Sequence, residues 1–161
     1  MKNKETFYIK ALDYVSLGKL INAKELLEQI LDIDPCFGKA HYLLGWIYFE
    51  YKNDIEKAKN HALAAMEFDP TNPLGFFLYC DVLIANQNLE TLKSFSKEAS
   101  RLKVIDKAYV FHKLACAYES RKQYVDAITT LHQTREIGAS ENWDLFVSDE
   151  ISRIRKKVKT K

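Results

Sequence analysis

The sequence predicts an all-α fold made of four antiparallel helix pairs and one further helix at the C-terminus. Apolar residues recur at helical spacing along the chain, and no segment alternates apolar and polar residues as a half-buried strand would. Two amphipathic segments also end on the same dipeptide 35 residues apart, at Asp34-Pro35 and Asp69-Pro70, which indicates an internal repeat. With 5 Gly and 3 Pro in 161 residues, the chain has few of the residues that the tight turns of a β-sandwich need.

The first two predicted pairs each consist of a helix, a short break and a second, amphipathic helix. In the first pair the break is Gly18-Lys19, and the second helix is expected at Leu20–Ile33, just before Pro35. In the second pair the break is Lys52-Asn53. The amphipathic helix that follows it shows its apolar face at Ala58, Ala62, Ala65, Met66 and Phe68.

The third pair is expected to begin at Asn72, an N-cap residue followed by proline at the first helical position. Its helices are predicted at 73–85 and 89–102, with a break at 86–88, and those of the fourth pair at 107–120 and 124–137. Gly138 is a natural helix stop, and Ser140 can cap the last helix. One face of that helix has the apolar residues Trp143, Phe146, Val147, Ile151, Ile154 and Val158.

Composition places the chain among globular proteins and excludes several other classes. Its 47% hydrophobic residues exclude disorder, and its 24 Lys and Arg nearly balance 22 Asp and Glu, so net charge does not indicate nucleic acid or membrane as a partner. No apolar signal core and no stretch of eighteen apolar residues is present, so we expect no membrane insertion. The three cysteines have no CxxC spacing and are typical of reduced thiols in a cytoplasmic protein.

The repeated units resemble the tetratricopeptide repeat, a helix–turn–helix unit of about 34 residues. The first unit matches the family pattern at Phe7, Ala11, Tyr14, Gly18, Ala23, Leu27 and Pro35. The second has one extra residue in its internal turn and matches at Leu44, Gly45, Tyr48, Ala58, Ala65 and Pro70. The fourth matches at Leu114, Ala115, Tyr118, Tyr124, Ala127 and Leu131.

Two units depart from the family pattern. The fourth has Ala139 where the family usually has proline. The third is degenerate, with Leu92 in place of alanine and Val104 in place of proline. The resemblance implies a right-handed α-solenoid with repeats at about 4–36, 37–72, 73–106 and 107–140, within a domain at 1–140. Residues 141–161 would form a C-terminal capping helix with a basic tail.

The resemblance also implies that the first helix of each pair lines a concave groove that binds a peptide or a partner's helix. The helical segments 42–51 and 74–85 are apolar almost all round, which independently favours contacts on every side. We expect the groove to be lined by Tyr8, Leu12, Tyr42, Trp46, Phe49, Phe77, Asp81, Ile84 and His112. Such a surface suits an apolar or aromatic segment, as in an adaptor or a chaperone-like scaffold.

Several alternatives remain open for these residues. The family pattern places Phe7, Tyr14, Tyr48 and Phe76 between helices, as ordinary core. The aromatic surface could also be covered by the terminal helix or buried in a homodimer. RNA binding by a helical-repeat groove ranks last, because it requires basic residues along a groove whose predicted residues are mainly apolar.

Asp81 is the one charge in an otherwise apolar helix. It could pair with a cationic or amide group of the ligand, or with Lys113 or His112 of the next unit. One branch of the family binds chaperone C-terminal carboxylates through Lys, Arg and Asn in the groove. The equivalent positions here hold apolar or aromatic residues, so that mode of binding is not expected: Tyr8, Leu12, Leu43, Leu74 and Leu78.

No pattern in the sequence predicts catalysis. His112, Cys116 and Glu119 share one helix face, but the helix provides no fourth metal ligand and no feature that would lower the pKa of the thiol. The tail could contact phosphates or simply offset a helix dipole, and we favour the second for Arg153, Arg155, Lys156, Lys157, Lys159 and Lys161. We therefore predict a protein-interaction module with no enzymatic activity, cofactor, metal or small-molecule substrate.

Overall fold

The structure is a computed structural model that describes residues 3–103, 105–137 and 141–159. Its regular elements are helices throughout these ranges, which confirms the predicted all-α class. The chain divides into two compact units, Met1–Val82 and Leu83–Lys161, and the boundary falls within one helix, α5. Each unit is described below by itself.

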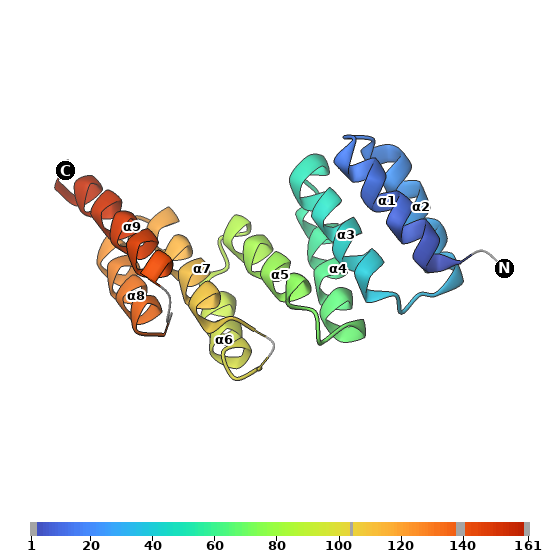
Figure 1. Cartoon of the computed structure of the whole chain (residues 1–161). Helices are drawn as coiled ribbons and strands as arrows, with labels where there is room; N and C mark the ends of the chain where they lie inside the picture. Colours follow the sequence, from blue (N-terminus) through green and yellow to red (C-terminus); the bar gives the residue numbers. More distant parts are fainter. Residues whose placement is uncertain (1–2, 104, 138–140, 160–161) are drawn as a thin grey trace. The chain divides into compact units, whose positions relative to one another are not determined.

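The first unit consists of two antiparallel helix pairs and the first part of α5. Helix α1 packs along α2, α2 packs against α3, and α3 packs along α4 (Figure 1). A π-helical turn, η1, continues α3 and leads to α4. The elements are α1 (Lys4–Ser16), α2 (Leu20–Ile33), α3 (Gly38–Ile47), η1 (Tyr48–Lys52), α4 (Ile55–Phe68) and α5 (Pro73–Ala85).

Capping side chains explain where several of these helices begin. The Asn3 side chain accepts a hydrogen bond from Glu5 N at the start of α1, and Asp54 Oδ1 accepts one from Lys57 N at 3.1 Å. At α5, Leu74 N donates to Asn72 Oδ1 at 3.1 Å, which is the cap predicted from the sequence. Each bond satisfies a backbone N–H that has no partner within its own helix.

Small residues allow the helices of the first unit to approach closely. A Cβ atom added at Gly45 of α3 would lie 2.8 Å from Leu78 of α5 and 3.1 Å from His61 Cβ of α4. A larger residue at this position would therefore push the three helices apart. Around this contact the core consists mainly of fully buried alanine and aliphatic side chains, among them Ala11, Ala23, Leu27, Ile30, Leu44, Ala58 and Ala62.

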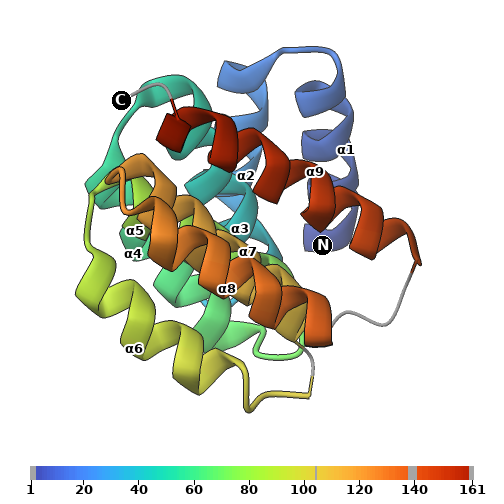
Figure 2. The same cartoon turned by 90° about the vertical axis from the view of Figure 1, so that its left-hand side faces the viewer.

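The second unit contains the end of α5 and four further helices. Helix α7 packs along α8, α6 contacts α7, and α9 packs against α8 (Figure 2). Three residues of the predicted apolar face of α9, Val147, Ile151 and Ile154, are buried with Ala127 and Leu131 of α8 and with Ala115. The helices are α6 (Leu89–Ala99), α7 (Lys107–Ser120), α8 (Tyr124–Ile137) and α9 (Glu141–Lys159).

Two local features differ from the sequence expectations. Helix α6 ends at Ala99 and not near residue 102, because the chain tightens: Arg101 N bonds Glu98 O, and Leu102 N bonds Ala99 O. The extra residue in the turn of the second pair is accommodated by η1, where the backbone widens to π-helical bonding. The predictions for Val104, Gly138, Ala139 and Ser140 concern positions outside the described residues.

The four aromatic residues that were expected to form the core differ in how deeply they are buried. Tyr48 and Phe76 are buried, as predicted, whereas Phe7 and Tyr14 of α1 are half-buried. The difference follows from the position of α1 in the first pair, since no earlier helix of the described chain packs against it.

Candidate functional site

The aromatic strip is our name for the predicted groove residues of the first unit: Tyr8, Leu12, Tyr42, Trp46, Phe49, Phe77 and Asp81. Tyr8 of α1 is half-buried, with its ring edge-on to Phe37 at 5.7 Å between centroids. Burial raises the pKa of the Tyr8 phenol, and the nearby Tyr42 phenol adds to the effect. The structure therefore brings these two predicted residues, from α1 and α3, close to each other.

Tyr42 and Trp46 of α3 and Phe49 of η1 are all half-buried. Tyr42 and Trp46 are four residues apart and so share one face of α3, and Phe49 follows in the π-helical turn that continues this helix. The Trp46 ring lies edge-on to Tyr51, with centroids 5.3 Å apart, and Tyr51 is 56% exposed. This face of α3 is thus aromatic and partly open to solvent.

The remaining predicted groove residues are divided between the two units. Phe77 and Asp81 of α5 are half-buried in the first unit, whereas Ile84 belongs to the second. Leu12 is 42% exposed on α1. Among the positions compared with the carboxylate-binding branch, Leu43 and Leu78 are buried, so only Tyr8, Leu12 and Leu74 remain accessible.

His112 of α7 contacts the C-terminal helix. Its ring lies 5.1 Å from that of Phe146 and 6.0 Å from that of Trp143, both on α9 and both in edge-on geometry. These contacts show what His112 packs against in the second unit, and its assignment to a groove stays a prediction.

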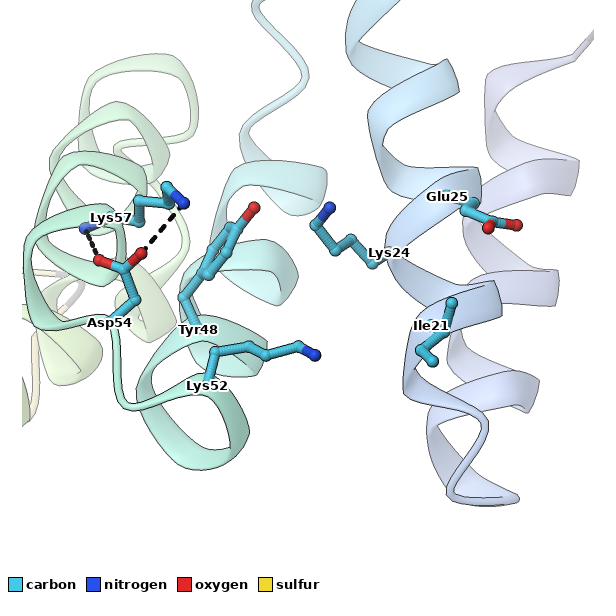
Figure 3. A pocket seen from close by; sticks show the side chains of 7 residues that line it. All are labelled: Ile21, Lys24, Glu25, Tyr48, Lys52, Asp54 and Lys57. Carbon is cyan, nitrogen blue, oxygen red and sulfur yellow. Dashed lines mark hydrogen bonds and ion pairs between the residues drawn. The ribbon is translucent and has the colours of Figure 1, made fainter.

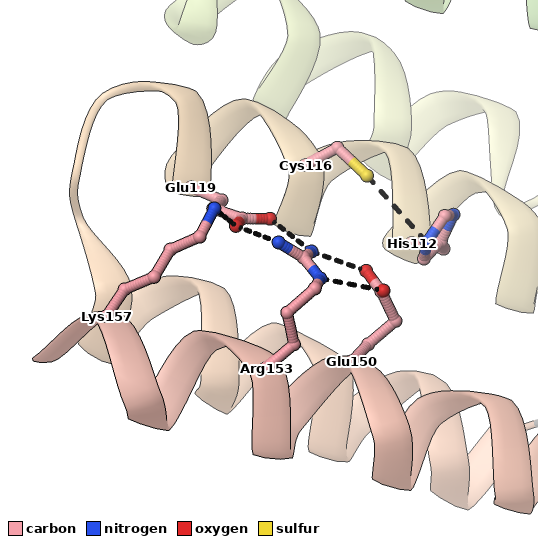
Figure 4. A network of polar contacts seen from close by, with 6 residues as sticks. All are labelled: His112, Cys116, Glu119, Glu150, Arg153 and Lys157. Atoms are coloured by element: carbon pink, nitrogen blue, oxygen red, sulfur yellow. Dashed lines mark hydrogen bonds and ion pairs between the residues drawn. The ribbon is translucent and has the colours of Figure 1, made fainter.

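The face of α7 with His112, Cys116 and Glu119 forms a contact with α9 (Figure 4). Cys116 Sγ lies 3.7 Å from His112 Nε2, and burial raises the pKa of the thiol, whereas a nucleophile would need a lowered one. No group of three or more potential metal-binding side chains occurs within the described ranges.

Two cations of the predicted basic tail are held by this same face. Arg153 Nη2 donates to Glu119 Oε2 at 2.7 Å and to Glu150 Oε2 at 2.8 Å, and Lys157 Nζ lies 2.8 Å from Glu119 Oε1 (Figure 4). The hydrogen bonds from Arg153 hold the pKa values of both carboxyl groups below their usual range. Arg153 and Lys157 therefore help to attach α9 to α7.

A surface hollow that sequence reasoning missed lies between α2 and the η1–α4 segment (Figure 3). This lysine hollow has a volume of about 560 Å³ and is lined by Ile21, Lys24, Glu25, Tyr48, Lys52, Asp54 and Lys57. The three lysines come from three different elements, so no periodic pattern connects them in the sequence. Only the packing of α2 against the second pair brings them together.

Comparison with known proteins agrees with this architecture. The tetratricopeptide repeat family model matches residues 5–35 and 38–72, which cover the two helix pairs of the first unit. The chain contains tetratricopeptide repeats. No curated protein sequence matches the chain.

Two solved structures have a similar fold. Pseudomonas aeruginosa pilF superposes with a TM-score of 0.75 at 20% identity, over 98% of this chain and 69% of that one. MamA of AMB-1 superposes with a TM-score of 0.67 at 22% identity, over 89% of this chain and 78% of that one. At these identities the likeness shows the fold alone.

The repeats at 5–35 and 38–72 support a scaffold for protein–protein interaction. No helix in the part of the chain that the structure describes has the length and apolar character to span a membrane.

Proposed function

We propose that the aromatic strip of the first unit binds an apolar or aromatic peptide segment, or one face of a partner helix, as an adaptor or chaperone-like scaffold does. The observation that supports this most is the half-buried state of Tyr42 and Trp46 on a single face of α3, with Phe49 half-buried on η1. Their neighbours on α3, Leu43, Leu44 and Ile47, are buried, so the rings are mounted on a rigid helix.

A strip of this kind favours binding for two physical reasons. Trp and Tyr side chains bury a large area while losing little rotamer entropy, and they are the residues most often found at interface hot spots. The ligand would therefore be rich in apolar or aromatic residues.

Replacing Trp46 by alanine tests the proposal. We expect Trp46→Ala to weaken binding of the partner by about 2 kcal/mol, or roughly 30-fold, because the anchor ring is lost from a rigid site. The partner is first obtained from a native lysate with the wild-type protein as bait, and its affinity is then measured by calorimetry. The matched control is Val125→Ala, which removes an exposed apolar side chain from α8 and should leave the affinity unchanged.

A triple variant with Tyr42→Ala, Trp46→Ala and Phe77→Ala distinguishes binding of a partner by the aromatic strip from self-association through it. Both proteins are first checked for equal helicity by circular dichroism and for mass by light scattering at several concentrations. A wild-type dimer that the triple variant converts to a monomer would assign the strip to self-association. If the two proteins capture the same partners, the strip is not the binding surface.

A further inference from the structure

We propose that the lysine hollow is a second binding site, separate from the aromatic strip, and that it binds an acidic peptide segment of a partner protein. None of the strip residues lines the hollow, which is formed by α2, η1 and the start of α4. The occupant follows from the distribution of charge in the hollow, from a phenol hydroxyl at its centre and from the exposed apolar surface beside it.

The positive charge in the hollow is only partly neutralised within the chain. Lys24 Nζ lies 2.9 Å from a carboxylate oxygen of Glu28, and Lys57 Nζ lies 3.0 Å from one of Asp54. Within the described residues, no carboxylate oxygen lies within 4.0 Å of Lys52 Nζ. The hollow therefore retains a cation that an incoming anion can pair with.

The acidic residues that line the hollow do not compete for this position. Figure 3 shows the Glu25 carboxylate on the far side of α2, pointing away from Tyr48. The Asp54 carboxylate is occupied, since it accepts hydrogen bonds from both Lys57 N and Lys57 Nζ. A ligand carboxylate between α2 and η1 would thus meet ammonium groups first.

Tyr48 supplies a fixed hydrogen-bond donor at the centre of this arrangement. Tyr48 is 9% exposed, and its hydroxyl points into the gap, towards the Lys24 ammonium (Figure 3). Lys57 Nζ lies 5.1 Å from the centroid of the Tyr48 ring. A carboxylate in the gap could accept bonds from the phenol and from the Lys24 ammonium, and a second acidic residue of the same peptide could pair with Lys52 (Figure 3). Such charge-assisted bonds are stronger than neutral ones.

The apolar surface beside the lysines favours a peptide over a small anion. Ile21 is 68% exposed at the rim, and it also lines an adjoining hollow of about 280 Å³ together with Tyr51 and Lys52. Tyr51 is 56% exposed. A segment in which aspartate or glutamate alternates with aliphatic or aromatic residues would fill both hollows and pair with the lysines.

The test is a selection of random 12-residue peptides displayed on phage against the wild-type protein. We expect the enriched peptides to combine acidic with apolar residues. In fluorescence anisotropy, the Lys24→Glu, Lys52→Glu double variant should bind these peptides at least about tenfold more weakly than the wild type does. Peptides in which Asn and Gln replace Asp and Glu should fail to bind the wild-type protein. Salt should weaken the wild-type interaction, because the contacts are charged.

Two control variants test whether the loss of peptide binding is specific to the lysine hollow. The Lys97→Glu, Lys103→Glu variant makes the same change in net charge on the second unit, and Tyr42→Ala alters the aromatic strip; both should bind the peptides like the wild type. Circular dichroism checks that the charge-reversed proteins are folded, and Lys52→Gln repeats the test without a new carboxylate.

Three outcomes would overturn the proposal. These are the absence of any enriched sequence, enriched peptides without acidic residues, and equal binding by the Lys24→Glu, Lys52→Glu variant. A parallel measurement uses vesicles of phosphatidylserine and phosphatidylcholine. Binding to these vesicles that depends on Lys52, with no peptide binding, would assign the hollow to a membrane surface and exclude the peptide. Loss of peptide binding here leaves the strip's partner unaffected, so the two proposals fail separately.

Discussion

His61 of α4 and His41 of α3 form a hydrogen-bonded pair with their Nδ1 atoms 3.0 Å apart. His41 Nε2 lies 2.9 Å from the carbonyl oxygen of Pro35, which can only accept, so the hydrogen on His41 is on Nε2. His41 Nδ1 is then the acceptor between the two rings, and His61 donates. These hydrogen bonds set both tautomers, and stacking on Tyr48, with 9° between the ring planes, fixes the orientation of the His61 ring.

This environment predicts an acid-sensitive stability. Burial lowers the pKa of His61 from 6.5 to about 4, so between these values the unfolded chain binds more protons than the folded one. The stability contributed by neutral His61 is complete above pH 6.5 and is lost as the pH falls towards 4. Allowing for screening by nearby water, we expect the free energy of unfolding to fall by on the order of 1–2 kcal/mol over this range.

Urea unfolding at several pH values measures the effect, together with an NMR titration of the His61 ring. His61→Phe, which keeps a ring beside Tyr48, should remove this part of the pH dependence. His132→Gln, on the exposed surface of α8, is the control and should retain it. An NMR titration that places the pKa of His61 near 6.5 would contradict the prediction.

At the scale of elements, all four helix pairs turn through a residue in the left-handed backbone region. These residues are Gly18 at φ 70°, Asn53 at 49°, Gln87 at 53° and Lys122 at 62°. Only the first is glycine, for which this conformation has no steric cost. The other three turns therefore contain a local strain that the packing of the flanking helices outweighs.

We predict that Lys122→Gly stabilises the protein by about 0.5–1 kcal/mol. Glycine removes the steric cost of the left-handed conformation, and this gain exceeds the added flexibility of the unfolded chain. The side chain of Lys122 is exposed, and the Lys122 N–H that bonds Glu119 O at 2.8 Å is kept. Thermal unfolding should show a rise in Tm of about 1–4 °C.

The control is the next residue along the chain. Gln123→Gly places the same residue where the backbone has no positive φ, so it should give no increase in stability. An equal rise in Tm for both variants, or a fall for Lys122→Gly, would exclude relief of backbone strain as the cause.

At the scale of the whole molecule, the two compact units make stability a local property. Repeats contact only their neighbours, so a change in one unit should weaken that unit first. The second unit depends on α9, since the buried side chains of Val147, Ile151 and Ile154 complete the core formed with α7 and α8.

We predict that Ile151→Ala destabilises the second unit by roughly 2–4 kcal/mol, because it leaves a cavity at a residue that is 4% exposed. In hydrogen exchange, the amides of α7, α8 and α9 should lose protection while those of α1 to α4 keep theirs. Val158→Ala, at a half-exposed position on the same helix, should change neither set. Equal acceleration of exchange in both units would show that they unfold together.

The helices and their pairing follow from the sequence because their signals are local. Apolar spacing marks α2, α7 and α8, and the Asn72–Pro73 cap marks the start of α5. The shared face of Tyr42 and Trp46 on α3 follows as well, since the two lie four residues apart within one helix, whereas the π-helical turn that places Phe49 does not follow from this spacing. These features depend on residues a few positions apart, whose geometry a helix fixes by itself.

The lysine hollow, the His41–His61 pair and the attachment of α9 through Glu119 and Arg153 depend on tertiary structure. Each joins side chains from different helices, and the contact is set by how closely those helices approach and how they are rotated. For His112, the sequence identifies the helix face but not that Phe146 of α9 packs against it. That contact is set by packing, since the core is close-packed and only one arrangement of the helices fills it.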